Sequence, residues 1–366
     1  MGKIVVSLLP PPPERRERRF SSILLIRPGG IGDAVLLAPA IQVLKERYPS
    51  IQLDVLAEQR NAAIFSLVPG IRNCFRYDVP GELWTVLRRR YDVVIDTEQW
   101  HYLSAVVARL IRAPITVGFG TNERRRLFTH PVTYSHDDYE AESFLHLLAP
   151  LGITEPALPV CPPLTIPPDA CRSADRLLRH VAGAEFVALF PGASIREKSW
   201  GVDRFASLAV LLNEKSVLLV VIGGPDDVIA GRSITACRGI LDLTGKTGLA
   251  ETAAILSRAR LLVSGDSGVL HLAALLGTRT VALFGPSNWT KWAPRGERHR
   301  LLLTGRSCAP CSSFGYFPSC PQTNGCTHDI PVADVFAVVG DHFPFTSEAV
   351  PAGRRISAGE VRGAIP

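Results

Sequence analysis

The sequence predicts an α/β protein with two domains, each built on a doubly wound parallel β-sheet. Apolar runs of strand length alternate with segments of helical periodicity, and this alternation occurs twice along the chain. Such alternation is typical of strands joined by helical crossovers, which form parallel sheets covered by helices. The length of 366 residues exceeds the roughly 250–300 residues at which a single core stops growing. We therefore expect two domains with a cleft between them.

The first series of elements follows a Pro-rich and basic extension, residues 1–20, which we expect to be a flexible tail. A strand at 21–27 ends at glycines, and helical periodicity follows over 34–49. Further strands are expected at 51–58, 73–79, 91–98 and 114–120, with helices at 61–68, 82–90 and 102–111. These elements make up the first domain, residues 21–157.

A Pro-rich segment separates the two series. Residues 158–169 read LPVCPPLTIPPD, a composition that prevents regular structure and suits a linker. The second domain, 170–342, is expected to have strands at 186–192, 216–224, 241–245, 260–266 and 278–286, and helices at 203–212, 250–259 and 268–276. We expect residues 343–366 to be a C-terminal tail.

The composition restricts the class of protein. Apolar residues make up 46% and charged residues 20%, which excludes bulk disorder, and the net charge of +6 favours acidic partners. There is no uninterrupted apolar run of about 18 residues, so we expect a cytoplasmic protein. The basic run at 14–19 is a solvated tail or a tether to a membrane surface. No helix-turn-helix, RNP-like or zinc-finger motif supports nucleic-acid binding.

The loop IRPGGIGDAVL, residues 26–36, combines glycines with an acid. Gly30, Gly32 and Val35 occupy the three glycine positions of a dinucleotide-binding motif, so the third glycine is missing. Asp33 would repel a phosphate at a helix N-terminus. Asp33 is therefore either an N-cap or a general base beside glycines that admit another molecule.

In the loop at 187–205, Ser194 and Lys198 follow the end of a strand. Hydroxyl and ammonium donors at this position suit a diphosphate. The alternative is a solvated charged loop. In VVIGGPDDV, residues 220–228, Asp226 and Asp227 suit the hydroxyls of a ribose, or they serve turn and capping chemistry.

The most distinctive loop, at 262–277, leads from a strand into a helix through Gly265. The backbone N–H groups, the Ser267 hydroxyl and the helix dipole predict an anion site. Asp266 is the expected N-cap, and His271 is either a core histidine or a ligand contact.

Together and in this order, over roughly residues 21–340, these four loops resemble the ADP-heptose:lipopolysaccharide heptosyltransferase family, glycosyltransferase family 9. The resemblance rests on GGIGDAVLLAPAIQVLKERYP (29–49), PGASIREKSW (191–200) and GDSGVLHLAALLGTRTVALFGPSN (265–288). It implies a GT-B fold, with two facing Rossmann-like domains and an inter-domain cleft. It also implies an acceptor on the first domain, a nucleotide sugar on the second, and metal-independent transfer with inversion.

The resemblance also implies roles for individual residues. Asp33 is the implied base, and Lys198 binds the donor phosphate and stabilises the leaving diphosphate. The implied donor-binding residues are Ser194, Lys198, Asp226, Asp227, Thr247, Asp266, Ser267, Gly268 and His271. The implied acceptor-binding residues are Gly30, Gly32, Arg60 and Arg124, although surface charge explains the two arginines equally well.

Four cysteines fall within nineteen residues: Cys308, Cys311, Cys320 and Cys326. This spacing is compatible with a structural zinc or iron–sulfur site, and equally with reduced thiols or a disulfide. No metal is expected to be required for transfer. The remaining cysteines, Cys74, Cys161, Cys171 and Cys237, are expected in the core.

The leading hypothesis is an inverting, metal-independent glycosyltransferase that transfers heptose from ADP-heptose to the lipopolysaccharide inner core. The expected partners are the nucleotide sugar and an anionic glycolipid at the inner membrane face, and the expected state is a monomer. One alternative keeps the fold but uses another nucleotide sugar or acceptor. The other is a nucleotide-sugar-binding homologue without turnover. An epimerase would need further acid/base groups that the sequence does not reveal.

Overall fold

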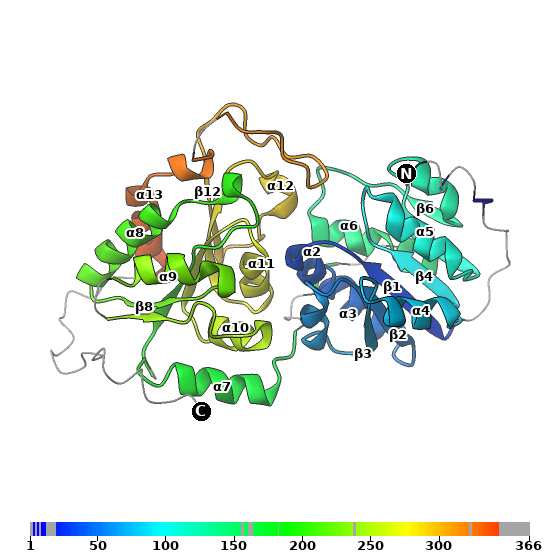
Figure 1. The fold of residues 1–366 in the computed structure, drawn as a ribbon, viewed down its shortest axis with the longest axis horizontal. Coiled ribbons are helices and arrows are strands. Elements are labelled where there is room, and N and C mark those ends of the chain that lie inside the picture. The colour runs from blue at the N-terminus through cyan, green and yellow to red at the C-terminus, as the bar shows by residue number, and fades with distance from the viewer. Residues whose placement is uncertain are drawn as a thin grey trace. The chain divides into compact units, whose positions relative to one another are not determined.

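The computed structural model describes most of the chain. The described residues are Lys3, Val6, 9–11, 20–154, 157–159, 164–181, 183–236, 239–321 and 324–343. The chain forms two compact units (Figure 1). Unit 1 comprises Met1–Thr165, Asn288–Ala293 and Ser312–Tyr316, and unit 2 comprises Ile166–Ser287, Pro294–Cys311 and Phe317–Pro366. The predicted second domain, 170–342, is therefore not continuous, because two of its segments belong to unit 1.

Unit 1 contains a six-stranded parallel sheet in the order β3-β2-β1-β4-β5-β6. Its strands are β1 (Ser22–Arg27), β2 (Gln52–Ala57), β3 (Ile71–Arg76), β4 (Val93–Asp96), β5 (Ile115–Phe119) and β6 (His130–Val132). This is the doubly wound order, in which the strand sequence reverses between β1 and β4. In open α/β sheets, ligands bind beyond the carboxyl ends of the strands at such a reversal.

Helices connect the strands of unit 1, as the alternation predicts. They are α2 (Ile31–Leu36), α3 (Ala38–Arg47), α4 (Pro80–Arg88), α5 (Tyr102–Leu110) and α6 (Glu140–His146), with 3₁₀ helices η1 (Ala62–Ser66), η2 (Glu123–Leu127) and η3 (Ala149–Leu151). The helix expected at 34–49 is divided at Leu37, and the one expected at 61–68 is the 3₁₀ helix η1. Strand β6 and helix α6 were not predicted.

Unit 2 repeats the same plan, with the order β12-β11-β10-β7-β8-β9. Its strands are β7 (Phe186–Phe190), β8 (Leu218–Val221), β9 (Ile240–Asp242), β10 (Leu261–Gly265), β11 (Arg279–Phe284) and β12 (His299–Leu303). Its helices are α7 (Pro168–Leu177), α8 (Val202–Glu214), α9 (Val228–Ile234), α10 (Leu249–Leu256), α11 (Gly268–Leu275) and α13 (Val332–His342), with η4 (Arg196–Lys198), η5 (Pro225–Asp227) and η6 (Thr327–Asp329). Helix α12 (Trp289–Trp292) lies in the 288–293 segment of unit 1. The reversal falls between β7 and β10, and the predicted α/β fold with two parallel sheets is confirmed.

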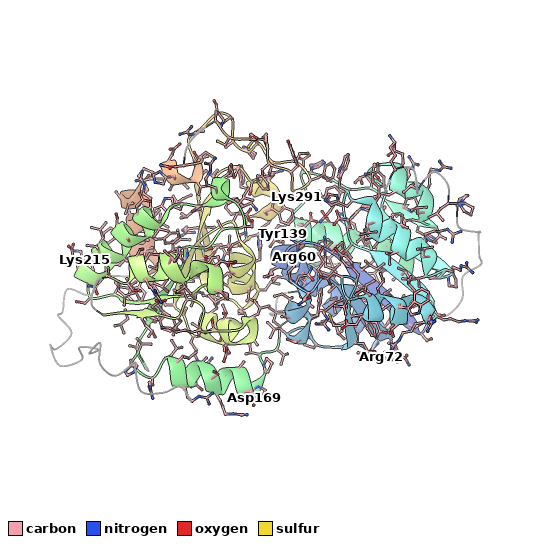
Figure 2. All side chains as sticks on the ribbon, viewed as in Figure 1. Arg60, Arg72, Tyr139, Asp169, Lys215 and Lys291 are labelled. Carbon is pink, nitrogen blue, oxygen red and sulfur yellow. The ribbon has the colours of Figure 1, made fainter. Side chains whose placement is uncertain are left out.

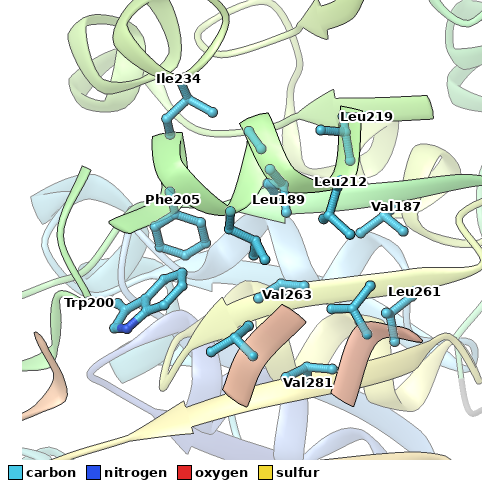
Figure 3. Close-up of a cluster of buried hydrophobic side chains, with 14 of the residues drawn as sticks. Val187, Leu189, Trp200, Phe205, Leu212, Leu219, Ile234, Leu261, Val263 and Val281 are labelled. Atoms are coloured by element: carbon cyan, nitrogen blue, oxygen red, sulfur yellow. The ribbon is translucent and has the colours of Figure 1, made fainter. Parts of the chain in front are cut away.

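The core of unit 2 packs helix α8 and helix α13 against the sheet, and Figure 3 shows its centre. Trp200 is 1% exposed and meets Phe205 edge-on, with ring centroids 4.9 Å apart. The Trp200 indole N–H donates to the Ile330 carbonyl at 2.9 Å, which satisfies its polar atom inside the core. This packing fixes the end of the loop that carries Lys198.

The N-terminal extension is only partly a separate tail. Val6 is 1% exposed and belongs to the core cluster that α4 and α5 form with the sheet of unit 1. Arg109 donates to the Pro10 carbonyl at 3.1 Å. The expectation of a free extension is therefore wrong for these residues, and the basic run at 14–19 lies outside the described residues. None of the helices in the described residues has the length and apolar character needed to cross a membrane.

Candidate active site

In unit 1, the turn between β1 and α2 places an acid at the point where the strand order reverses. Gly29 has a φ of +97°, a left-handed conformation that glycine adopts readily. Gly30 is the N-cap of α2 without a capping side chain, and Gly32 is the second residue of the helix. Asp33 lies in the first turn, so the interpretation of Asp33 as an N-cap is wrong. Its side chain is 23% exposed, which leaves it accessible to a ligand.

Two buried side chains orient the Asp33 carboxylate. Gln99 Nε2 donates to Asp33 Oδ1 at 3.3 Å, and Arg27 Nη1 lies 3.8 Å from the same oxygen. Arg27 is 1% exposed and is fixed by the Thr97 carbonyl at 2.9 Å and by Glu98 Oε2 at 3.2 Å. These contacts turn Oδ2 toward Gly30, where a Cβ would lie 3.3 Å away. The carboxylate is therefore positioned with Oδ1 engaged by the protein.

Gln99 also joins Asp33 to a second carboxylate, Glu140, which is fully buried. Gln99 Nε2 donates to Glu140 Oε1. Lys291 Nζ lies 2.9 Å from Glu140 Oε2, and the Tyr134 hydroxyl donates to that oxygen at 2.9 Å. Burial raises the pKa of Glu140, the Lys291 ammonium counteracts part of this rise, and the Asp33 carboxylate adds to it. Lys291, labelled in Figure 2, is 3% exposed and is the counter-charge of this buried acid.

In unit 2, the loops after β7 and β10 bring a lysine and an acid together where the strand order reverses. Lys198 Nζ lies 2.7 Å from Asp266 Oδ2. The Ser287 hydroxyl donates to this oxygen at 2.5 Å, and His271 Nε2 lies 3.6 Å from Oδ1. Burial opposes ionisation of Asp266, but Lys198 and His271 bring the pKa of this carboxyl below its ordinary value. Asp266 is thus ionised near neutral pH, and it holds the Lys198 ammonium in place.

The N-terminus of α11 lies beside this ion pair. Ser267, not Asp266, is the N-cap, because the Ser267 hydroxyl accepts the N–H of Leu270 at 3.2 Å. The predicted capping role of Asp266 is therefore wrong. A Cβ at Gly265 would lie 3.0 Å from the Lys198 carbonyl, so the two loops approach each other closely. The N-terminal N–H groups of α11, from Gly268 onward, and the helix dipole favour an anion here.

Asp227 lies between the loops that follow β7 and β8. Its Oδ2 accepts the Gly224 N–H at 2.8 Å, and a Cβ at Gly192 would lie 2.7 Å from its Oδ1. Burial raises the pKa of Asp227, the Gly224 N–H lowers it, and the adjacent carboxylate of Asp226 raises it. Asp226 is exposed. A ribose contact by either acid stays a prediction.

Three further predicted residues lie on accessible loops. Ser194 is exposed after β7, and the half-buried Thr247 shares a hydrogen bond of 2.9 Å with Thr252 at the start of α10. In unit 1, the side chain of Arg60, labelled in Figure 2, is 65% exposed and pairs with Glu58. Their roles in binding donor or acceptor stay predictions.

Arg124 cannot contact an acceptor. Its side chain is 0% exposed, its guanidinium pairs with Asp96, and it donates to the Glu98 carbonyl. The acceptor-binding role predicted for Arg124 is therefore wrong. Within η2, Arg124 and Leu127 are buried whereas Arg125 and Arg126 are exposed, and the Arg124 guanidinium neutralises the buried carboxylate of Asp96.

The four clustered cysteines lie close enough to influence one another. Burial, followed by the neighbouring thiols of Cys311, Cys320 and Cys308, raises the pKa of Cys326 to about 11. Among the described residues, no group of three or more His, Cys, Asp or Glu side chains is placed to hold a metal ion. A structural metal site therefore stays a prediction.

Two of the other cysteines do not fit the predicted core position. Cys74 is exposed and Cys171 is half-buried. Cys161 and Cys237 lie outside the described residues.

The sequence interpretation did not identify Arg27, Gln99, Glu140 and Lys291. A signal existed for two of them, because Arg27 and Gln99 follow the apolar runs of β1 and β4, the strands at the reversal. Glu140 and Lys291 carry no such signal. They are 151 residues apart in sequence, and only the tertiary structure brings them together.

Comparisons with known proteins identify the family and the fold of this chain. Residues 81–315 match glycosyltransferase family 9 (heptosyltransferase). A curated relative, lipopolysaccharide heptosyltransferase 3 of Escherichia coli, is 29% identical over 289 residues, which cover 72% of this chain and 83% of the relative.

Two solved structures share the fold. A glycosyl transferase family 9 protein from Veillonella parvula superimposes with a TM-score of 0.76 and 21% identity, covering 89% of this chain and 98% of that one. E. coli ADP-heptose lps heptosyltransferase II gives a TM-score of 0.72 with 21% identity, over 88% of this chain and 98% of that one. These likenesses show that both units together have the fold of the family.

Proposed function

The chain belongs to glycosyltransferase family 9, the heptosyltransferases, and on this premise we propose that it transfers heptose from ADP-heptose to the lipopolysaccharide inner core. The proposed reaction is metal-independent and inverts the anomeric centre. The proposed site of action is the cytoplasmic face of the inner membrane, where a monomer meets an anionic glycolipid acceptor. The observation that carries the proposal is the Lys198–Asp266 pair beside the N-terminus of α11.

On the donor side, this arrangement suits a diphosphate that gains charge. Lys198 contributes an ammonium 2.7 Å from Asp266, and α11 contributes backbone N–H groups capped by Ser267. Both are fixed before the substrate arrives, and preorganised donors of this kind stabilise developing charge effectively. Asp266 orients Lys198 and His271, and its lowered pKa keeps it ionised in that role.

On the acceptor side, Asp33 is the proposed general base. Arg27 and Gln99 engage its Oδ1, so Oδ2 is the oxygen that accepts a proton. Gly30 places no side chain beside that oxygen, where a Cβ would lie 3.3 Å away, and the proposed position of the acceptor sugar is next to this glycine. General bases act through such a positioned, partly exposed carboxylate.

The reaction is a single displacement. The acceptor hydroxyl oxygen attacks the anomeric carbon of the heptose while its proton passes to Asp33. The bond between the anomeric carbon and the diphosphate oxygen breaks, and its electron pair leaves with ADP. Lys198 and the α11 N-terminus neutralise the charge on ADP, and because attack and departure occur on opposite faces, the configuration inverts.

The donor assay tests this proposal directly. We expect transfer from ADP-heptose to a heptose-deficient lipopolysaccharide in the presence of EDTA, and none from UDP-sugars. Activity with a UDP-sugar alone would exclude the heptose donor, and loss of activity in EDTA that Mg²⁺ restores would exclude metal independence. Tight binding of ADP-heptose without transfer to any lipid acceptor would indicate a binding protein.

The base is tested by Asp33→Ala. We expect it to bind the donor normally and to lose transfer by about 10²–10⁴-fold, the range typical of general acid–base catalysis. Glu46→Ala, which removes an exposed acid of α3, is the matched control and keeps its activity. A loss of less than about tenfold in Asp33→Ala would show that another group accepts the proton.

A further inference from the structure

Unit 2 has a cavity of about 330 Å³ that the proposed reaction does not use. Its lining consists of Glu185, Ser257, Arg258, Ala259, Arg260, Leu276, Gly277, Thr278, Arg279 and Arg298. These residues come from the amino-terminal ends of the strands and from the carboxyl ends of α10 and α11. Because the strands are parallel, this edge of the sheet is opposite the edge that carries Lys198 and Asp266.

The sheet register concentrates positive charge along this edge. Arg260 directly precedes β10, Arg279 opens β11, and Arg298 directly precedes β12. These three strands are neighbours in the sheet, and Thr280 pairs with His299, so Arg279 and Arg298 lie side by side. Like charges placed opposite each other on neighbouring strands destabilise a sheet. A bound anion would remove this repulsion.

The protein neutralises this charge only in part. Among the described residues that line the cavity, four are arginines and one is an acid, Glu185, which pairs with Arg260 at 2.7 Å. Arg258 pairs with Asp175 at 2.7 Å, outside the cavity lining, and Arg298 donates to the Gly277 carbonyl at 3.1 Å.

Several N–H groups at the cavity therefore remain able to donate hydrogen bonds to a ligand. The buried Nε–H of Arg260 has no hydrogen-bond partner within the described part of the chain. Arg279 Nη1 lies 3.4 Å from the His342 ring nitrogen, and each guanidinium has five N–H donors.

Two histidines report the positive field at this edge. Burial, followed by the charges of Arg298 and His342, lowers the pKa of His299 to about 4. Burial, followed by the charges of Arg300 and Arg279, also lowers the pKa of His342. Asp341 acts in the opposite direction on His342 but does not reverse the effect.

We infer that this cavity is a second anion site, which binds a phosphate-bearing ligand through the guanidiniums of Arg260, Arg279 and Arg298. Guanidinium groups match the geometry of phosphate oxygens with paired N–H donors. The cavity volume exceeds that of a single phosphate, so a diphosphate or a phosphate with an organic substituent fits the space. The ligand is distinct from the sugar donor, because the diphosphate site of the proposed function lies at the other edge of the sheet.

The source of the phosphate is either a soluble compound or an anionic lipid headgroup, and calorimetry and vesicle binding distinguish them. The full chain is saturated with ADP, which occupies the proposed donor site, and is then titrated with inorganic pyrophosphate at constant ionic strength. In parallel, ADP-saturated protein is sedimented with phosphatidylcholine vesicles that contain about 20% phosphatidylglycerol, or none.

The test variant is Arg279→Gln/Arg298→Gln, and Arg232→Gln, an exposed residue of α9, is the control for loss of charge. We expect the double variant to weaken pyrophosphate or vesicle binding at least tenfold, because charge-assisted hydrogen bonds at two guanidiniums are lost. The control binds as the wild type does. If the double variant does not fold, Arg279→Gln alone is used, with a weaker loss expected.

The outcomes separate clearly. Binding of pyrophosphate supports a soluble ligand, and binding only to vesicles with phosphatidylglycerol supports a lipid headgroup. Equal binding by the double variant and the wild type, or no binding of either probe in the presence of ADP, overturns the inference. Transfer activity of the double variant is measured separately, so a failure of this inference does not bear on the proposed function.

Discussion

Substitution of Lys291 by methionine tests the buried network that supports Asp33. Lys291 Nζ lies 2.9 Å from Glu140 Oε2, and both side chains are buried, with 3% and 0% exposure. The ammonium also donates to the Ser135 and Asp138 carbonyls at 2.8 and 3.1 Å. Methionine keeps the apolar stem and removes the charge, so Glu140 would be left as an unpaired buried carboxylate.

The expected loss of folding stability follows from the loss of this ion-pair partner. Removing one member of a buried ion pair costs about 3–5 kcal/mol. For a domain of this size, each kcal/mol shifts the midpoint of thermal unfolding by roughly 2–4 °C. We therefore expect Lys291→Met to lower the Tm by about 10 °C. In Lys291→Met/Glu140→Gln, where no charge is buried, we expect most of this loss to be recovered.

The pH dependence gives a second signature. Burial raises the pKa of Glu140, and without the Lys291 ammonium the hydrogen bond from Gln99 offsets only part of this rise. A carboxyl whose pKa is higher in the folded state than in the unfolded state destabilises the fold above that pKa, and protonation at lower pH removes the penalty. The Tm difference between Lys291→Met and the wild type should thus be large near about pH 8.5 and shrink toward about pH 5.5.

The assay is thermal unfolding followed by circular dichroism at both pH values, with the double variant in parallel. A Tm loss below about 3 °C would contradict the reasoning. So would a loss that does not change with pH, or a double variant as unstable as Lys291→Met. The last result would mean that the carbonyl contacts of Lys291, rather than its charge, stabilise unit 1.

The other predictions concern the donor loops and the corrected arginine. Lys198→Met should lower the affinity for ADP, measured by calorimetry, and the transfer rate, each by at least about tenfold, because a charge-assisted contact to the diphosphate is lost. Unchanged affinity for ADP would show that Lys198 does not bind the donor. Arg124→Met should destabilise unit 1 by about 3–5 kcal/mol in urea unfolding, because Asp96 loses its buried partner. The enzyme that remains folded should keep its KM for the acceptor. A raised KM with unchanged stability would instead support acceptor binding by Arg124. Gly192→Ala should cost about 1–3 kcal/mol, because the new Cβ would lie 2.7 Å from Asp227 Oδ1; a variant as stable as the wild type would show that this carboxylate moves freely.

Most of the fold is predictable because its elements are encoded locally. The run FVALF at residues 186–190 and the run LLVS at 261–264 are apolar and short, and glycines follow both, so their identity as buried parallel strands needs no distant information. Several elements escaped prediction: β6 and α6 in unit 1, and α7, α9, β12 and α13 in unit 2. Strand β6 has only three residues, His130–Val132, which is too short to show periodicity.

The candidate site was predictable only in part. Lys198, Asp266 and Ser267 follow strands at the reversal of strand order, so a motif and an α/β pattern are sufficient to group them. Arginine side chains usually lie at the surface, yet Arg124 is fully buried. Its partner, Asp96, ends a strand 28 residues earlier, and neither residue alone indicates the ion pair.

The sequence by itself therefore determined most of the strand and helix alternation, the two sheets, and the loops to which we assign donor and acceptor binding. These features depend on side-chain periodicity and on glycines at fixed spacing, which are properties of short segments. The tertiary structure alone decided that segment 288–293 joins unit 1, that Lys291 neutralises Glu140, and that arginines at the starts of three neighbouring strands line one cavity. These features depend on which distant residues share a buried space, because the charge of a buried group must be balanced by whatever side chain the fold places beside it.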